Sequence, residues 1–227
     1  MKKFTVLFFT ALVAVLFALP FSPSAVAQED ETAEDITQDC TFLADDNAAS
    51  LPNLKDNTVT TVWKAPAGAT LTINSASPMA GLYISWDRDA VGWSLETHRD
   101  GKAIPLTEGG TDSFLHEYIP LDKEEYSLTI TFKEAAVITD IRVLSPGSLP
   151  SWVQTWKPML EKADMLVYST HADDELLWFG GTLPTYAGEY QMKVQVAYLI
   201  YHGAARGEYF RCHELLDGLW AVGVRNY

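Results

Sequence analysis

Three runs in the middle of the chain alternate apolar with more polar residues: Leu82–Trp86, Trp93–Thr97 and Tyr126–Phe132. A period of two is typical of half-buried β-strands. Turn sequences that contain glycine separate the runs, and no helical pattern lies between them. Many short strands of this kind predict a β-sandwich (jelly roll) over residues 41–146.

The pattern changes at Pro146–Pro150, a proline- and glycine-containing sequence that we interpret as a linker. Beyond it, Trp152, Trp156 and Leu160 follow one another at a spacing of four residues. That spacing predicts one short amphipathic helix inside a linker region that covers 147–163.

Two apolar runs then alternate with two helical patterns. In order, these are strand 164–169, helix 176–187 interrupted by Pro184, strand 194–201, and helix 208–222 ended by Gly223. This order predicts the first βαβα part of a parallel α/β domain at 164–227, and so a two-domain α+β protein. Two parallel strands cannot close a core, so we expect this domain to be truncated, with a small complete α/β appendage as the alternative.

The N-terminus has the features of a secretory signal. Lys2 and Lys3 precede an apolar run from Phe4 to Leu19, and a small-residue cleavage site ends at Ala27. We therefore expect residues 1–27 to be removed and the protein to be exported. The alternative is a membrane anchor, for which the run is short, and no later stretch is predicted to cross a bilayer.

The charge of the chain disfavours nucleic acid as a partner. The net charge is −14, whereas a protein that binds nucleic acid needs a basic surface to meet the phosphates. Part of the acidity lies in residues 28–40, which we predict to be a disordered spacer. Export permits Cys40 and Cys212 to pair, but they fall in different predicted domains, so a disulfide, free thiols and an outside partner all remain open.

The sequence His171-Ala172-Asp173-Asp174-Glu175 places one imidazole and three carboxylates directly after a predicted strand. The carboxyl ends of such strands carry the ligand sites of open α/β sheets. Adjacent carboxylates repel one another, and a divalent metal relieves that repulsion. We predict His171 and Asp174 as ligands of a zinc ion whose bound water is activated, with Asp173 as the general base.

This motif, followed by Gly180-Gly181-Thr182, resembles the signature of the LmbE-like (PIG-L) N-acetylglucosaminyl deacetylases over roughly residues 164–224. The resemblance implies a Rossmann-like domain, Zn²⁺ bound by His171 and Asp174, and Asp173 as general base. It also implies that Arg211 lines the substrate pocket. The chain departs from the family at Ala172, where proline is usual.

The third zinc ligand of that family is a histidine from a later motif, and the chain ends before any such motif. His202 follows the second predicted strand and is a candidate substitute, although we favour a substrate-binding role for it. For His213 we favour a solvent-facing or packing role. The alternative is that the acidic residues of the motif only start a helix, because helix N-termini favour carboxylates. That alternative does not explain His171.

The sandwich region loosely resembles discoidin-like (galactose-binding-like) domains, through Leu54-x-Asp56-Asn57 followed by Thr61-x-Trp63. The resemblance implies glycan binding with aromatic side chains as stacking platforms. Trp86 and Trp93 fall on apolar alternating positions and are predicted in the core, which leaves Trp63 as the better surface candidate. We predict His98 and His116 at the surface.

The sequence supports two functional hypotheses. The first is an exported zinc-dependent hydrolase that removes the N-acetyl group from an N-acetylated amino sugar or glycoconjugate, with the sandwich as a glycan-binding accessory. The second is a carbohydrate-binding or adhesion protein whose deacetylase segment is a non-catalytic remnant.

Overall fold

The computed structural model of the protein describes residues 31–111, 113–200 and 209–226. The predicted signal peptide at 1–27 and the candidate residue His202 lie outside these residues. Within the described part of the chain, no helix has the length and apolar character needed to cross a membrane.

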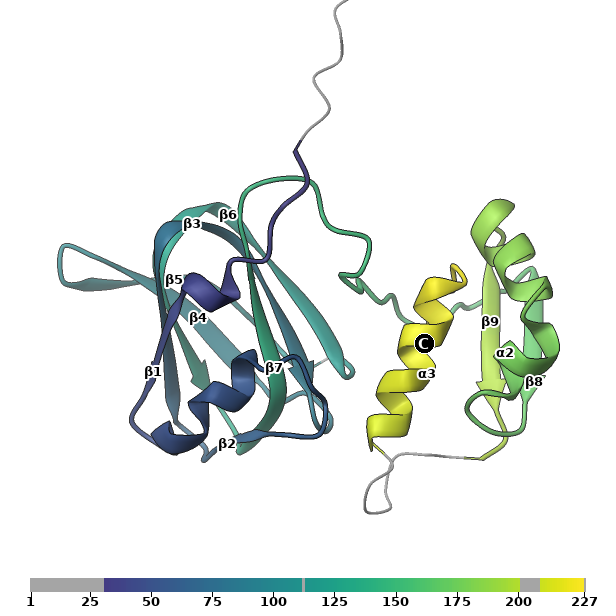
Figure 1. The fold of residues 1–227 in the computed structure, drawn as a ribbon, viewed down its shortest axis with the longest axis horizontal. Coiled ribbons are helices and arrows are strands. Elements are labelled where there is room, and N and C mark those ends of the chain that lie inside the picture. Colours follow the sequence, from purple (N-terminus) through teal and green to yellow (C-terminus); the bar gives the residue numbers. More distant parts are fainter. Residues whose placement is uncertain (1–30, 112, 201–208, 227) are drawn as a thin grey trace, which may run out of the picture. The chain divides into compact units, whose positions relative to one another are not determined.

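Seven antiparallel strands form the larger part of the fold and curve around a shared interior (Figure 1). The order in the sheet is β2-β7-β3-β6-β4-β5, and β1 pairs with β3. The β-sandwich prediction is therefore confirmed. The strands are β1 (Thr41–Ala44), β2 (Trp63–Ala65), β3 (Thr70–Trp86), β4 (Trp93–Arg99), β5 (Lys102–Gly109), β6 (His116–Phe132) and β7 (Ala136–Leu144).

Strands β3 and β6 are each 17 residues long and are shared between the two halves of the sandwich. The first half of β3 pairs with β1, and its second half, from Gly81, pairs with β7. Register shifts separate these halves at Met79 in the β3–β6 pairing. Such irregularities bend a strand and increase its twist, which lets one strand serve both layers.

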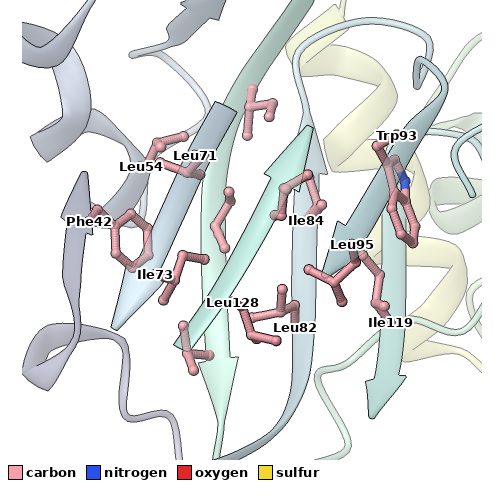
Figure 2. Close-up of a cluster of buried hydrophobic side chains, with 14 of the residues drawn as sticks. Phe42, Leu54, Leu71, Ile73, Leu82, Ile84, Trp93, Leu95, Ile119 and Leu128 are labelled. Atoms are coloured by element: carbon pink, nitrogen blue, oxygen red, sulfur yellow. The ribbon is translucent and has the colours of Figure 1, made fainter. Parts of the chain in front are cut away.

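The interior of the sandwich is filled by alternating side chains of these strands (Figure 2). Leu71 and Ile73 on β3 and Leu128 and Ile130 on β6 are fully buried. Their spacing of two is the one seen in the sequence, because successive side chains of a strand point to opposite faces. The periodicity of the sequence identified the β6 part of this core correctly at Leu128, Ile130 and Phe132, whereas Tyr126 of the same predicted run is exposed.

Residues 31–40 are ordered, so the predicted disordered spacer is wrong for this stretch. The Ala33 amide donates to the Ser148 carbonyl at 2.9 Å, and Arg142 Nη1 donates to Asp35 Oδ2 at 3.1 Å. Thr37 is fully buried, and its Oγ1 accepts a hydrogen bond from the Val143 amide at 2.8 Å. The acidic composition is real, but backbone pairing and one arginine hold the segment on the sandwich.

Two 3₁₀ helices, η1 (Thr37–Asp39) and η2 (Ala48–Lys55), were not predicted. Segment η2 contains Pro52 and buries only Leu54 among its residues. A helix that buries one side chain leaves almost no periodic signal in the sequence, which is why the pattern did not reveal it.

The C-terminal region contains the predicted strand–helix–strand–helix order. Strands β8 and β9 pair in parallel, with Val167 opposite Val196. Gly223 has a φ of 94° after the last helix, as expected of a left-handed C′ residue. Membership of a larger Rossmann-like sheet stays an expectation. The elements are β8 (Met165–Ser169), α2 (Asp174–Phe179), η3 (the π-helix Pro184–Glu189), β9 (Val194–Tyr198) and α3 (Tyr209–Ala221).

The helix predicted over Trp152 to Leu160 is absent from the structure, where residues 151–163 form turns and extended segments. Pro158 would remove a hydrogen bond from a helix at that position and clash with the preceding turn. The apolar spacing has another cause: Trp156 packs against Trp220 of α3, with ring centroids 5.5 Å apart.

Cys40 and Cys212 are both buried and are not joined to each other. Cys40 belongs to the interior of the sandwich, and Cys212 belongs to a separate cluster with Leu115 and Leu216. The structure therefore contains no disulfide between Cys40 and Cys212, which was one of the three possibilities left open by the sequence.

Candidate functional site

The acidic turn after β8 brings two of the predicted residues together. The backbone amide of His171 donates to Asp174 Oδ2 at 3.0 Å, and His171 Nδ1 lies 3.3 Å from the same oxygen. The hydrogen bond from the His171 amide holds the pKa of Asp174 below its ordinary value. Both side chains are partly exposed. The structure therefore places the imidazole and the carboxylate of the predicted ligand pair side by side.

Asp173 lies on the other side of this turn and contacts Arg211. The Nη2 atom of Arg211 donates to Asp173 Oδ2 at 3.0 Å and to the Ala172 carbonyl at 2.9 Å. Asp173 has a φ of 113°, which is unusual for a residue with a side chain and is often found at functional sites. The predicted base and the predicted substrate-pocket arginine are thus in direct contact.

Glu175 stabilises the turn from inside, a role that sequence reasoning missed. Its side chain is fully buried, and Oε2 accepts the Asp173 amide at 3.0 Å. The signal was present in the sequence, because the first turn of a helix is where a carboxylate satisfies backbone amides. Glu175 is best described as a support for the conformation of Asp173.

A catalytic zinc ion takes three protein ligands. In the described ranges 31–111, 113–200 and 209–226, no group of three His, Cys, Asp or Glu side chains is arranged to hold a metal. His171 and Asp174 supply two converging donors and not three. The described residues therefore fit a metal only in part.

A groove on the sandwich lies between β5 and the first half of β6 and has a volume of about 530 Å³. Ile104 and Leu106 of β5 and Leu121 of β6 give it apolar walls. Arg99, Glu117 and Glu125 also line it, so charged groups meet the apolar walls. A concave apolar surface with a few convergent polar groups is typical of small-molecule sites.

Glu125 is the buried partner of Arg99 in this groove. Its side chain is 6% exposed and the side chain of Arg99 is 48% exposed, so only the arginine reaches solvent freely. Thr97 Oγ1 donates to Glu125 Oε2 at 2.9 Å. A guanidinium has five N–H donors, and its contact with Glu125 uses only part of them.

Glu117 lies at the base of the same groove. Its Oε2 accepts Trp86 Nε1 at 3.2 Å and Trp93 Nε1 at 3.0 Å, while Oε1 accepts the Gly110 amide at 3.1 Å. Three donors thus satisfy the oxygens of this buried carboxylate. No local sequence pattern reveals this arrangement, because the folding of the strands brings Trp86, Trp93 and Gly110 to Glu117.

The three tryptophans of the sandwich strands, Trp63, Trp86 and Trp93, are core residues. Trp86 and Trp93 are buried, as predicted, but Trp63 is fully buried too, so its selection as the surface candidate was wrong. Trp63 packs against Phe132 with ring centroids 5.8 Å apart. It lies on the short strand β2, whose alternation is too brief to identify a core position from sequence.

Of the predictions for three histidines, the one for His116 is wrong. His116 was placed at the surface, but it is 8% exposed and its Nδ1 lies 2.7 Å from the Tyr83 hydroxyl. His213 is 2% exposed, which agrees with a packing role. His98 is at the surface, as predicted, and its Nε2 lies 3.2 Å from Glu96 Oε1.

Comparisons with known proteins give little at the level of sequence. No model of a protein family matches the chain. No curated protein matches it either.

Solved structures resemble the sandwich region at low similarity. The module named CpGH89CBM32-6, produced by Clostridium perfringens, has a TM-score of 0.44 and 14% identity, and the match covers 50% of this chain and 100% of that one. The family 32 carbohydrate-binding module of C. perfringens NanJ, in complex with galactose, has a TM-score of 0.43 and 15% identity over 50% and 99% of the two chains. Chitosan-binding module 1 from a chitosanase/glucanase of Paenibacillus sp. IK-5 has a TM-score of 0.41 and 12% identity over 48% and 98%.

Proposed function

We propose that this protein binds carbohydrate through its β-sandwich, at the groove between β5 and the first half of β6. The observation that carries the proposal is that this groove combines apolar walls with the Arg99–Glu125 ion pair. The loose resemblance of the sequence to galactose-binding-like domains supports the same function. Export, expected from the N-terminal segment, is part of the proposal.

A sugar ring suits such a groove because it has two kinds of surface. Its C–H faces are apolar and pack against aliphatic or aromatic side chains, which Ile104, Leu106 and Tyr118 offer here. Its hydroxyls donate and accept hydrogen bonds, and the planar guanidinium of Arg99 can bond two neighbouring oxygens at once. The groove accommodates a ligand of one or two rings by volume.

Calorimetric titration of the full chain with galactose, N-acetylgalactosamine and N-acetylglucosamine oligosaccharides tests the proposal. We expect at least one of them to bind, and Arg99→Ala to weaken that binding by about tenfold or more. Arg88→Ala is the matched control, because Arg88 is exposed and does not line the groove. Ile104→Glu, at a partly exposed position on the edge strand, is expected to weaken binding without loss of folding.

Binding of none of these sugars would overturn the proposal. Equal affinities of the wild type, Arg99→Ala and Ile104→Glu would also overturn it, because the ligand would then bind elsewhere. Unfolding curves of each variant show that the comparison is made between folded proteins.

The second candidate function is the zinc-dependent removal of N-acetyl groups from amino sugars. It is favoured by the juxtaposition of His171 with Asp174 and of Arg211 with Asp173 at the carboxyl end of β8. Such an edge is where open α/β sheets bind their ligands. In this proposal His171 and Asp174 would hold Zn²⁺, which would polarise the amide, Asp173 would act as the base, and Arg211 and His202 would contact the substrate, while the described residues include no third ligand beside that pair.

Metal analysis and acetate release separate this candidate from the first. Stoichiometric zinc in the purified chain, lost in both His171→Ala and Asp174→Asn, would support it. Acetate release from N-acetylglucosamine conjugates is expected to fall sharply in Asp173→Asn. A chain that retains zinc in His171→Ala, or one that releases acetate unchanged in Asp173→Asn, would contradict the assigned roles.

A further inference from the structure

A second cavity, of about 420 Å³, lies where β3, β6 and β7 face the segment that follows the sandwich. Its volume is within the range of small-molecule sites. The strands contribute Tyr83, Asp140 and Arg142, and the following segment contributes Trp152 and Gln154. None of these residues belongs to the groove proposed for carbohydrate, so this cavity is a separate site.

The lining of this cavity has more negative than positive charge. Three carboxylates line it, those of Asp35, Asp140 and Asp217, but only one guanidinium, that of Arg142. Arg142 is already shared, since its Nη1 lies 3.1 Å from Asp35 Oδ2 and its Nε lies 3.3 Å from Asp140 Oδ1. The lining therefore lacks positive charge, and a cation bound in the cavity would supply it.

Asp140 is the most deeply buried carboxylate of the lining. It is 6% exposed, and its Oδ1 accepts no hydrogen bond within the described residues, although it lies 3.3 Å from Arg142 Nε as an ion pair. Burial raises the pKa of its carboxyl to about 6, even though Arg142 acts in the opposite direction. A buried carboxylate without enough donors is costly, and an ammonium group supplies both charge and donors.

Aromatic and amide groups complete the lining. Trp152 is 43% exposed and packs edge-on against Tyr83, with ring centroids 5.7 Å apart. An indole face attracts cations as well as the apolar faces of small rings. Gln154 is buried and donates its Nε2 to Asp217, so its position relative to the carboxylates is defined.

We propose that this cavity binds a primary ammonium group carried on a small hydroxylated molecule, such as an aminohexose. The ammonium contacts the Asp140 carboxylate, and the ring packs against Trp152. Gln154, Ser85 and the acidic side chain of Asp217 are close enough along the lining to accept or donate hydrogen bonds to hydroxyls. A neutral hexose of the same shape lacks the charge that the lining requires, and an anionic one adds to the imbalance.

Titration of the full chain with three probes of nearly equal shape tests this inference: D-glucosamine, D-glucose and D-glucuronate. At neutral pH we expect glucosamine to bind at least about tenfold more tightly than glucose, and glucuronate to bind no better than glucose. Asp140→Asn keeps the shape of the side chain and is expected to weaken glucosamine binding by about tenfold or more. Asp45→Asn, which removes the same charge from an exposed position outside the cavity, is expected to have no effect.

Trp152→Ala gives a second variant at an exposed position and is expected to weaken glucosamine binding. Arg99→Ala, in the other groove, is expected to leave it unchanged, which separates this site from the proposed carbohydrate groove. Absence of glucosamine binding, equal binding of glucose and glucosamine, or unchanged binding in Asp140→Asn would each overturn the inference.

Discussion

The Nε2 atom of His116, on β6, lies 3.1 Å from the Nδ1 atom of His213, on α3. The other ring nitrogen of His213 lies 2.9 Å from the Trp86 carbonyl, and His116 Nδ1 lies 2.7 Å from the Tyr83 hydroxyl. A carbonyl only accepts, so His213 Nε2 donates and its Nδ1 accepts from His116. His116 Nδ1 then accepts from Tyr83. Each proton in this buried chain has one defined position, and the chain joins α3 to the sandwich.

Removal of His213 should destabilise the protein. His213→Ala leaves the Trp86 carbonyl and the His116 N–H without partners in a buried place and creates a cavity. We expect the free energy of unfolding to fall by about 2–4 kcal/mol in urea titrations. His98→Ala, at a surface position, is the control and should change it by less than about 0.5 kcal/mol. Similar effects of the two substitutions would contradict the buried hydrogen-bond chain.

The same pair should make stability depend on pH. Burial lowers the pKa of both His116 and His213 below the ordinary value of 6.5, and the neighbouring histidine lowers that of His116 further. The unfolded chain then binds more protons than the folded one, so stability is full above about pH 6.5 and decreases as the pH falls below it. The groups that face the pair are the Tyr83 hydroxyl, the Trp86 carbonyl and Asp87.

Urea unfolding at a series of pH values from 8 to 5 measures this dependence. A variant with His116→Gln and His213→Gln lacks the two titrating groups, so its stability should change less over that range than the wild type's. A stability difference between the wild type and this double variant that stays constant from pH 8 to 5 would contradict the lowered pKa values.

Glu117 should be among the most important polar residues of the sandwich. Glu117→Ala removes the acceptor for two indole N–H groups and the Gly110 amide, all of which lie in the interior. We expect a loss of about 3 kcal/mol or more in the free energy of unfolding. Glu134→Ala, at an exposed position, is the control. A small effect of Glu117→Ala, within about 0.5 kcal/mol of the control, would rule out this role.

Gly223 should tolerate no side chain. Its φ is 94°, and a Cβ placed on it would lie 2.6 Å from the Cα of Gly188, a backbone atom that cannot move aside easily. Gly68 has a similar φ of 80° but open space around it. Gly223→Ala should therefore destabilise the protein by more than the roughly 1 kcal/mol expected for Gly68→Ala, as thermal unfolding can measure. Equal shifts of the two melting temperatures would show that the close approach to Gly188 does not matter.

The parts of the fold that the sequence predicted are those with strong periodicity. The strands around Leu82, Leu95 and Ile130 alternate cleanly, and all three residues are buried. The helix expected near Trp156 is absent because Trp156 packs against Trp220 of α3 and Trp152 packs against Tyr83 of β3, so the two residues do not form one helical face. Ordering of residues 31–40 depends on distant partners such as Ser148 and Arg142, which no local pattern reveals.

The candidate sites divide in the same way. His171, Asp173 and Asp174 are neighbours in the sequence, so their proximity could be predicted, and Arg211 was found through the resemblance to a family. The groove and the second cavity are built by residues such as Arg99 and Glu125, or Asp140 and Trp152, that come from separate elements. Each looks like an ordinary surface position when the sequence is read alone, because only the pairing of strands brings it to its partner.

The most direct test of carbohydrate binding by the sandwich is an NMR titration of the isotope-labelled protein with the oligosaccharide that binds most tightly in calorimetry. We predict that backbone amide shifts change along β5, from Ile104 to Gly109, and along the first half of β6, from Glu117 to Leu121. Shift changes confined to the acidic turn near His171, or the absence of saturable changes along β5 and β6, would contradict the account.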